Sequence, residues 1–289
     1  MPNYVVAVSG GVDSVVLLSM LATGNLPNPS SQIPIANLIV AHFDHGIRDE
    51  SAGDAEFVGN LAKEHGLLFE TKREELGAGT SEELARDRRY AFLREVATKH
   101  NARIMTAHHA DDLVETIAIN LVRGTGWRGL AVLDSSDIDR PLLGMTKLEI
   151  KNYAEKHRLD WREDVTNNDT KYLRNDLRKK MTTLDPQMRQ LLGLYRNRQV
   201  VLRKETDSEA SRIVGDSPYA RHLIIYSPSD AAEELLRAII VRDSGYYPTR
   251  PQLRHALHAV KVRHGGKRYE IASGVALMFT TTHFVIVKS

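Results

Sequence analysis

The sequence predicts an α/β fold in which helices cover a parallel sheet, followed by a helical linker and a small α+β domain. Three observations lead to this prediction. Short apolar runs alternate with helical periodicity through the first half of the chain, as in parallel sheets with right-handed crossovers. The polar motifs follow the predicted strands, where such sheets bind ligands. The C-terminal part has closely spaced strand patterns instead.

The composition narrows the class of protein. The chain has 289 residues, 42% hydrophobic and 26% charged, which supports a buried core and argues against disorder. It has no cysteine, so disulfides, thiolate metal sites and cysteine nucleophiles are excluded. No apolar run approaches the ~18 residues of a membrane span, and the N-terminus lacks a signal-peptide pattern. We therefore expect a soluble cytoplasmic protein with no membrane partner.

The first domain is expected to consist of alternating strands and helices. Its strands are short apolar runs, which is typical of buried strands. They are expected at residues 4–8, 36–41, 67–71 and 103–107. Helices are expected at residues 15–21, 52–65, 80–100 and 111–122. In the third helix Thr80 and Glu83 form a capping-box pattern, which places the start of the helix at Thr80.

The alternation weakens after residue 150. Residues 186–212 have the pattern of one long polar helix. From about residue 219 the order is β-α-α-β-β-β, with "KRYEI", "VALMFT" and "HFVIVK" as the last three strands. We expect a first domain over residues 1–185, a helical linker over 186–214 and a small α+β domain over 215–289.

The stretch "VAVSGGVDSVVLLSML" places a glycine-rich turn between a strand and a helix, which predicts an anion site at the helix N-terminus. The glycines let the backbone approach a phosphate closely. Asp13 is suited to hold a Mg²⁺ that bridges phosphate oxygens. A Walker A loop would need a lysine here, and the G-x-G-x-x-G spacing is also absent. The turn consists of Ser9, Gly10, Gly11, Val12, Asp13 and Ser14.

Two further polar motifs follow predicted strands. "AHFDHGIRDES" includes His45, and in isolation it also fits a solvated loop. "AHHADDLVETIAINLVRGTG" puts Asp111 and Glu115 one helical turn apart, with His108 and Asp112 near the start of the same helix. These residues cluster carboxylates and imidazoles, but the H-E-x-x-H spacing of a metallohydrolase is absent.

Two basic segments complete the candidate site. "ELARDRRYAF" presents Arg86 and Arg89 on one helix face. "DVTNNDTKYLRNDLRKK" includes Arg174, Asn175 and Arg178, and it also fits a basic solvated helix. The basic run of residues 171–180 could track a nucleic-acid backbone. It is continued by Arg189, Arg196, Arg198, Arg203 and Lys204.

"SGGVDS" resembles the signature loop of the PP-loop ATP pyrophosphatases, whose fold is a five-stranded parallel sheet with helices on both faces. The motifs "HFDHGIR", "AR-x-x-RY", "AHHADD-x-x-ET", "RPLL" and "RN-x-x-R" follow in order up to about residue 180. Together they resemble the tRNA(Ile)-lysidine synthase family. Thr166 stands where family members often have serine, and we expect this chain to lack the further C-terminal modules of some members.

The resemblance implies an ATP-dependent ligase that forms a carbon–nitrogen bond. In the first step, ATP adenylates the C2 oxygen of the wobble cytidine in tRNA(Ile) with a CAU anticodon, and pyrophosphate leaves. In the second step, the ε-amino group of free L-lysine attacks C2 and displaces AMP, which gives lysidine. The implied cofactors are ATP, as cosubstrate, and Mg²⁺.

The resemblance also implies roles for the candidate residues. The catalytic residues are Asp13, which binds the metal, Asp112, which is the base or the lysine anchor, and Arg174 and Arg178, which neutralise phosphates. The nucleotide is held by the Ser9–Ser14 turn, His45 and Arg123. The substrates are held by Arg86, Arg89, His108, Asp111, Glu115 and Asn175.

Alternatives stay open at this point. The chain also fits another PP-loop ATP pyrophosphatase that acts on tRNA or on a small molecule. A nucleotide-sensing RNA-binding module without catalysis is a second alternative, although the turn and the carboxylates of an enzyme are intact. A homodimer is among the oligomeric states that the sequence allows.

Overall fold

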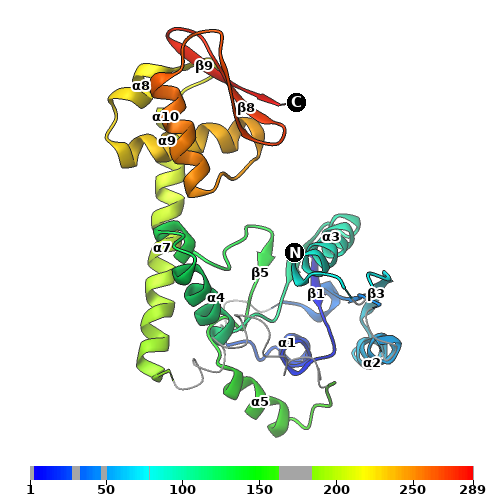
Figure 1. Cartoon of the computed structure of the whole chain (residues 1–289). Helices are drawn as coiled ribbons and strands as arrows, with labels where there is room; N and C mark the ends of the chain where they lie inside the picture. The colour runs from blue at the N-terminus through cyan, green and yellow to red at the C-terminus, as the bar shows by residue number, and fades with distance from the viewer. Residues whose placement is uncertain (1–2, 28–32, 47–50, 78, 163–183, 289) are drawn as a thin grey trace. The chain divides into compact units, whose positions relative to one another are not determined.

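The computed structural model describes residues 3–27, 33–46, 51–77, 79–162 and 184–288 (Figure 1). The chain divides into two compact units, each treated by itself. The N-terminal unit comprises Met1–Gly124 and Val132–Arg196, and the C-terminal unit comprises Thr125–Ala131 and Asn197–Ser289. The division falls within the long helix α7, Pro186–Ile213, which the sequence predicted at 186–212. The three-part domain scheme stays a prediction.

A five-stranded parallel sheet forms the centre of the N-terminal unit, with the strand order β3-β2-β1-β4-β5. The predicted fold class is therefore confirmed. Because β1 is central and its neighbours are reached in opposite directions along the sheet, the carboxyl end of β1 is a topological switch point. The strands are β1 Asn3–Ala7, β2 Leu38–Asp44, β3 Leu68–Arg73, β4 Ala102–Met105 and β5 Ile138–Asp139.

Helices cover both faces of this sheet. Alternate residues of β1 point to opposite faces, so Val6 packs in the cluster with α1, α2 and α5, whereas Val5 packs with α3. Both valines are fully buried. Before α7, the α-helices in the described part of this unit are α1 Val12–Thr23, α2 Ser51–Glu64, α3 Glu82–Lys99, α4 Ala110–Val122 and α5 Lys147–Lys156.

Two helix starts differ from the sequence prediction. Helix α1 begins at Val12, three residues before the predicted start, because the N–H groups of Ser14 and Val15 already donate to the Gly11 carbonyl. The predicted Thr80 cap of α3 is wrong by one residue. The Ser81 hydroxyl accepts from the Leu84 N–H at 3.2 Å, whereas the Thr80 hydroxyl donates to a carbonyl in the preceding loop.

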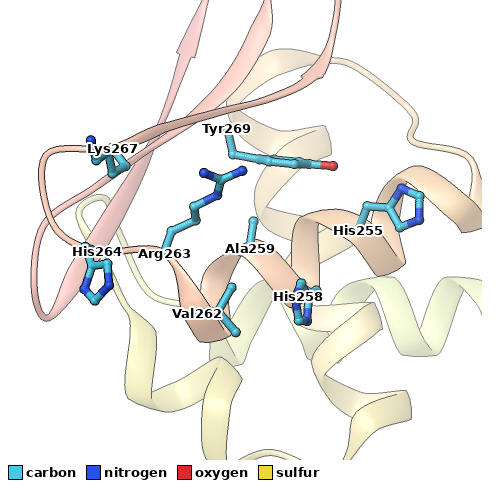
Figure 2. A pocket seen from close by; sticks show the side chains of 8 residues that line it. All are labelled: His255, His258, Ala259, Val262, Arg263, His264, Lys267 and Tyr269. Carbon is cyan, nitrogen blue, oxygen red and sulfur yellow. The ribbon is translucent and has the colours of Figure 1, made fainter.

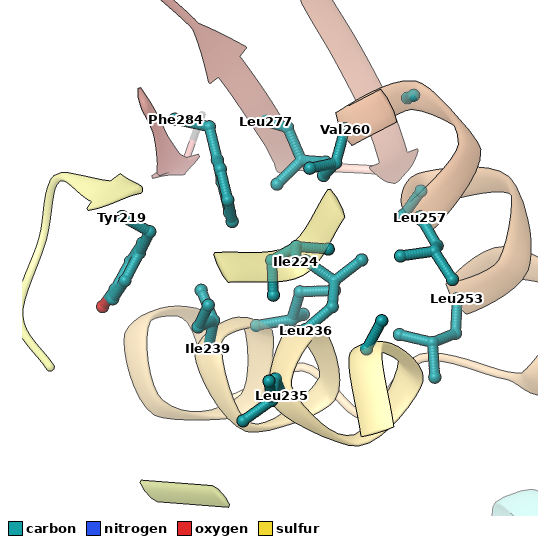
Figure 3. Close-up of a cluster of buried hydrophobic side chains, with 14 of the residues drawn as sticks. Tyr219, Ile224, Leu235, Leu236, Ile239, Leu253, Leu257, Val260, Leu277 and Phe284 are labelled. Carbon is teal, nitrogen blue, oxygen red and sulfur yellow. The ribbon is translucent and has the colours of Figure 1, made fainter. Parts of the chain in front are cut away.

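The C-terminal unit packs three helices against a four-stranded antiparallel sheet with the order β6-β9-β8-β7. Its core contains Ile224, Leu236, Leu253 and Phe284 (Figure 3). The sequence predicted two helices here, but Pro228 separates a short first helix from the second. The elements are β6 Tyr219–Ala220, α8 Arg221–Tyr226, α9 Ser229–Ser244, α10 Arg250–Val262, β7 Arg268–Ala272, β8 Val275–Phe279 and β9 His283–Lys288.

Candidate active site

The Ser9–Ser14 turn joins β1 to α1 at the switch point of the sheet. Gly10 has φ +92°, a conformation that favours glycine, and its carbonyl accepts from the Arg162 N–H at 2.9 Å. Gly11 caps α1 without a side-chain hydrogen bond. Within the described residues, the N–H groups of Gly10, Val12 and Asp13 donate no hydrogen bond. The turn therefore presents free donors at a positive helix end.

The two serines of the turn differ in burial and in hydrogen bonding. Ser14 is buried, and its hydroxyl donates to the Gly11 carbonyl at 2.9 Å while accepting from the Ser9 N–H at 3.1 Å. It therefore fixes the shape of the turn. Ser9 is exposed, with its hydroxyl 3.3 Å from that of Ser14. Behind the turn, buried His42 donates from its Nδ1 to the Val8 carbonyl at 2.9 Å, which ties β2 to the end of β1.

Asp13 lies in the first turn of α1 and is the point where three elements meet. Its Oδ1 is 2.5 Å from the Lys147 ammonium at the start of α5 and 3.8 Å from His109 Nε2 at the start of α4. Its Oδ2 forms no hydrogen bond or ion pair with a described residue. The Asp13 side chain is 31% exposed. A carboxylate, an ammonium group and an imidazole thus lie directly beside the Ser9–Ser14 turn.

A capping box holds the carboxylates at the start of α4. Asp112 Oδ2 accepts from the His109 N–H at 3.0 Å, and the His109 ring accepts from the Asp111 N–H at 3.2 Å. Asp111 is more heavily engaged, since its Oδ2 accepts from the Lys147 N–H at 2.7 Å and its Oδ1 is paired with Arg189. Asp112 Oδ1 has no contact with a described residue. Of the two neighbouring carboxylates, Asp112 is therefore the more available to a ligand.

His108 is neutral at physiological pH. Burial lowers its pKa from the ordinary 6.5 to about 3, against the opposing charge of Asp112. The positive charges of Arg140, Arg86 and Arg89 contribute to the same lowering of the pKa. Its Nδ1 lies 2.8 Å from the Thr106 hydroxyl. The His108 ring therefore interacts electrostatically both with Asp112 of α4 and with Arg86 and Arg89 of α3.

The arginines of α3 gather around Tyr90. The guanidinium carbons of Arg86 and Arg89 lie 5.2 and 5.5 Å from the centre of the Tyr90 ring. Burial, followed by the charge of Arg89, lowers the pKa of His45. The Nδ1 atom of His45 is buried and has no hydrogen-bond partner in the described part of the chain. A buried nitrogen without a partner is a candidate contact for a ligand.

Other predicted site residues lie at the far end of α4, are buried, or fall outside the described residues. Arg123 follows the last turn of α4, so it lies about 18 Å along the helix axis from Asp111. Glu115 is buried, with only 3% of its surface exposed. Arg174, Asn175 and Arg178 lie outside the described residues, as does most of the basic run 171–180. The roles of all these residues stay predictions.

The continuation of that basic run differs from the prediction of a free track of positive charge. Arg189 is paired with Asp111. Arg196 is buried and donates to the carbonyls of Val132 and Leu133 at 2.7 and 2.8 Å. Arg203 donates to the Ala131 carbonyl at 3.1 Å. At these three positions the guanidinium groups stabilise the protein itself, because they satisfy a carboxylate and loop carbonyls.

Sequence reasoning missed Lys147 and the capping role of His109. Lys147 follows Thr146, whose hydroxyl accepts from the Glu149 N–H at 3.2 Å in a second capping box. The pattern Thr-x-x-Glu would have predicted this helix start, but not its approach to Asp13. Among the described residues, no group of three or more His, Asp and Glu side chains is arranged to hold a metal ion.

Comparisons with known proteins agree with this architecture. A family model described as a PP-loop domain matches residues 2–184. A tRNA(Ile)-lysidine synthase from Wolbachia pipientis wMel is 39% identical over 193 residues, covering 63% of this chain and 43% of that protein. A tRNA(Ile)-lysidine synthase from Persephonella marina is 27% identical over 305 residues, covering 99% of this chain and 66% of that protein. The chain thus spans between 43% and 66% of the length of these curated relatives.

A solved structure shares the fold. The U34-tRNA thiolase NcsA from Methanococcus maripaludis, solved with its 4Fe-4S cluster, superposes with a TM-score of 0.57 at 18% sequence identity. The match covers 69% of this chain and 72% of that one. At this identity the likeness concerns the fold alone. No helix in the described ranges is long and apolar enough to span a membrane.

Proposed function

The chain belongs to the PP-loop domain family, and from this premise we propose that it is an ATP-dependent ligase that joins lysine to the wobble cytidine of tRNA(Ile) with a CAU anticodon. The products are lysidine, AMP and pyrophosphate. The observation that carries the proposal is the Ser9–Ser14 turn, whose free N–H groups stand beside the Asp13–Lys147 pair and the carboxylates of α4. The names of the relatives that match the chain point to the same reaction.

In the first step the turn binds the pyrophosphate part of ATP. The N–H groups of Gly10, Val12 and Asp13 donate to oxygens whose negative charge grows as the bond to the α-phosphorus breaks. The phosphorus becomes bonded to the C2 oxygen of cytidine. Lys147 supplies from α5 the positive charge that a Walker A loop carries within its own sequence. His45 Nδ1 is available to the nucleotide.

Asp13 fits a magnesium ion that is shared with the substrate. Mg²⁺ usually takes one or two carboxylates and completes its shell with phosphate oxygens and water, so one aspartate beside a phosphate site is enough. Both contacts of Asp13 fall on Oδ1, which leaves Oδ2 for the ion. When bound, Mg²⁺ would neutralise charge on the phosphates.

In the second step the lysine amine attacks C2. The C2–N bond forms, the C2–O bond breaks, and AMP leaves with the oxygen. The amine has an ordinary pKa of about 10.4, so it must lose a proton before it attacks. Asp112 is the better acceptor, because its Oδ1 is unengaged whereas both oxygens of Asp111 are bound within the protein. Asp111 instead positions Lys147 through its backbone N–H.

The remaining parts of the proposal concern partners and location. Free L-lysine is the second substrate, and the enzyme acts in the cytoplasm, where tRNA is modified. Arg86 and Arg89 are proposed to hold the tRNA near His108, since all three belong to one electrostatic cluster. Whether the protein forms a homodimer stays a prediction.

Mass spectrometry of nucleosides tests this function. A tRNA(Ile) transcript with a CAU anticodon, incubated with the protein, ATP, Mg²⁺ and lysine, is expected to yield lysidine. A transcript with a GAU anticodon is the matched control, because it lacks the wobble cytidine. ATP–pyrophosphate exchange without lysidine would point to another PP-loop ATP pyrophosphatase. The absence of both products would contradict the proposal.

A further inference from the structure

The C-terminal unit contains a pocket of about 540 Å³ between the end of α10 and the turn that leads into β7 (Figure 2). A volume of this order is enough for a nucleotide-sized ligand. Five basic side chains and an aromatic ring line it, contributed by α10 and by the segment that leads into and begins β7. The pocket is lined by His255, His258, Ala259, Val262, Arg263, His264, Lys267 and Tyr269.

The residues that line the pocket come from a stretch of sequence that contains basic residues but no acidic ones. Between Asp243 and Glu270 the sequence contains six Lys or Arg and three His, but no acidic residue. The whole chain has a net charge of only +2, so this segment concentrates positive charge far above the average. The lining includes Arg263, Lys267 and all three histidines of the segment, and it includes no carboxylate. Such a surface attracts anions.

The basic side chains of the lining are not engaged within the described part of the protein. None of the side chains of Arg263, Lys267 and the three histidines forms a hydrogen bond or ion pair with a described residue. On the same helix, but outside the pocket, Arg254 is 3.2 Å from Glu233. Unpaired cations that converge on a hollow are available to a ligand, whereas cations paired with acids are already satisfied.

The frame of the pocket is rigid. Arg221 is buried and donates to the Val260 carbonyl at 2.6 Å and to the carbonyls of Thr280 and Thr281 at 3.2 and 3.3 Å. It thereby fixes the end of α10 to the β8–β9 turn. The Gly266 N–H donates to the Phe279 carbonyl at 2.7 Å, which fixes the turn that carries Lys267. Because these hydrogen bonds already order the site, ligand binding loses little conformational entropy there.

The Tyr269 ring forms the remaining wall. In Figure 2 the Arg263 side chain extends from the helix end toward the side of the pocket on which Tyr269 lies. A flat aromatic ring beside cations is the combination that binds nucleotides, because bases stack on the ring while phosphates meet the cations. A metal ion fits less well, since no described group of His, Asp and Glu is arranged to hold one.

We propose that the pocket between α10 and β7 is a nucleotide-phosphate site, in which Arg263 and Lys267 bind a phosphate and Tyr269 stacks on the attached base. The nucleotide can belong to an RNA chain or be free in solution, since both present the same chemistry. If the nucleotide belongs to RNA, the inference rests on the proposed function. The pocket would then be a second site of contact with the tRNA substrate.

Binding by the full-length protein tests the site. The double variant R263A/K267A removes two positive charges from the pocket. The matched control K261A/R268A removes the same charge from α10 and β7 at positions that do not line the pocket. The probe is a fluorescent tRNA(Ile) transcript with a CAU anticodon, whose binding is followed by anisotropy over a salt series. Circular dichroism and thermal unfolding show whether each variant is folded.

We expect the pocket variant to bind tRNA about tenfold more weakly than the parent. The salt slope, which is the change in log affinity with log salt concentration, should decrease by the equivalent of about one to two phosphate contacts. The control variant should bind within about twofold of the parent, because its charges act only through the general field. If R263A/K267A and K261A/R268A lose tRNA affinity equally, the loss comes from the overall positive charge of the unit. That result would contradict the proposed site. A third variant, Tyr269→Ala, should weaken tRNA binding without changing the salt slope.

A calorimetric titration with ATP distinguishes the free nucleotide from RNA. If the pocket binds free nucleotide, the parent takes up two ATP per chain and R263A/K267A takes up one, while tRNA affinity is unchanged. If neither tRNA nor ATP binding differs between parent and pocket variant, the proposal is wrong. Lysidine formation is measured separately, so tRNA binding by the pocket without lysidine would contradict only the proposed function.

Discussion

The two units of the chain use positive charge in opposite ways. In the N-terminal unit the cations beside the turn are paired with acids, as in Lys147 with Asp13 and Arg189 with Asp111. In the C-terminal unit the pocket of Arg263 and Lys267 has no acid in its lining. Paired charges hold a defined geometry and keep both acid and base available for chemistry, whereas unpaired cations simply attract an anion. We therefore assign reaction chemistry to the first unit and ligand binding to the second.

Removal of Asp13 should produce the largest effect. The variant Asp13→Asn keeps the size of the side chain but loses the charge that balances Lys147 and that we propose binds Mg²⁺. We expect tRNA-dependent pyrophosphate release to fall by about 10³-fold. The matched control is Glu155→Gln, an exposed acid on α5, which should be neutral. Unchanged pyrophosphate release in Asp13→Asn would contradict the assignment of the reaction to the paired charges of the N-terminal unit.

Asp112→Asn should separate the two steps. The amide oxygen can still accept from the His109 N–H and cap α4, but it cannot take a proton from the lysine amine. We expect lysidine formation to fall by about 10²–10⁴-fold while pyrophosphate release continues. Asp111→Asn is the comparison variant, in which we expect a smaller loss. A larger loss in Asp111→Asn than in Asp112→Asn would reverse the assignment of the base.

Lys147→Ala tests whether the cation from α5 acts on the nucleotide. The Thr146 cap remains in this variant, so α5 should still form. We expect about a 10²-fold drop in the rate of pyrophosphate release, with tRNA affinity unchanged. Lys151→Ala, an exposed lysine on the same helix, is the control. The reverse pattern, with tRNA binding lost and release unchanged, would place Lys147 in the same class as Arg263 and Lys267.

The smallest expected effect concerns the pH dependence of stability. The folded protein lowers the pKa of His108 to about 3, whereas the ordinary value is 6.5, so the unfolded chain binds a proton that the folded chain does not. The contribution of neutral His108 is therefore complete above pH 6.5 and is lost as the pH falls toward 3. Between pH 7 and pH 5 the loss should be about 2 kcal/mol in the free energy of unfolding.

Urea denaturation at the two pH values measures this loss. His108→Asn, which does not titrate there, should show a difference between pH 7 and pH 5 that is smaller by the same amount. An equal difference in the parent and the variant would mean that His108 is accessible to protons in the folded state. Arg86, Arg89 and Arg140 would then not act on it as described.

The fold was largely predictable because its signals are local. Strand and helix periods, the glycines of the turn and the "SGGVDS" motif lie within short stretches of sequence. The errors are local as well. Thr80 and Ser81 are adjacent residues that can both cap a helix. Helix α1 begins directly after the Gly11 cap, before the first residue of the apolar helical pattern.

The site was less predictable because it depends on packing between distant segments. Lys147 and Arg189 reach the site from α5 and from α7, and no spacing in the sequence relates them to Asp13 or Asp111. Arg123 was assigned to the nucleotide through the family resemblance, and the length of α4 separates it from Asp111, so its role stays a prediction. The excess of positive charge before Glu270 was visible in the sequence, whereas its convergence on a pocket required the tertiary structure.

The most direct test of the central claim is a crystal structure with an ATP analogue whose α–β bridge is methylene, which blocks the reaction. We expect its two terminal phosphates within hydrogen-bond distance of the N–H groups of Gly10, Val12 and Asp13, with Lys147 near the bridging group. The same analogue bound elsewhere, with water on these three N–H groups, would contradict the account.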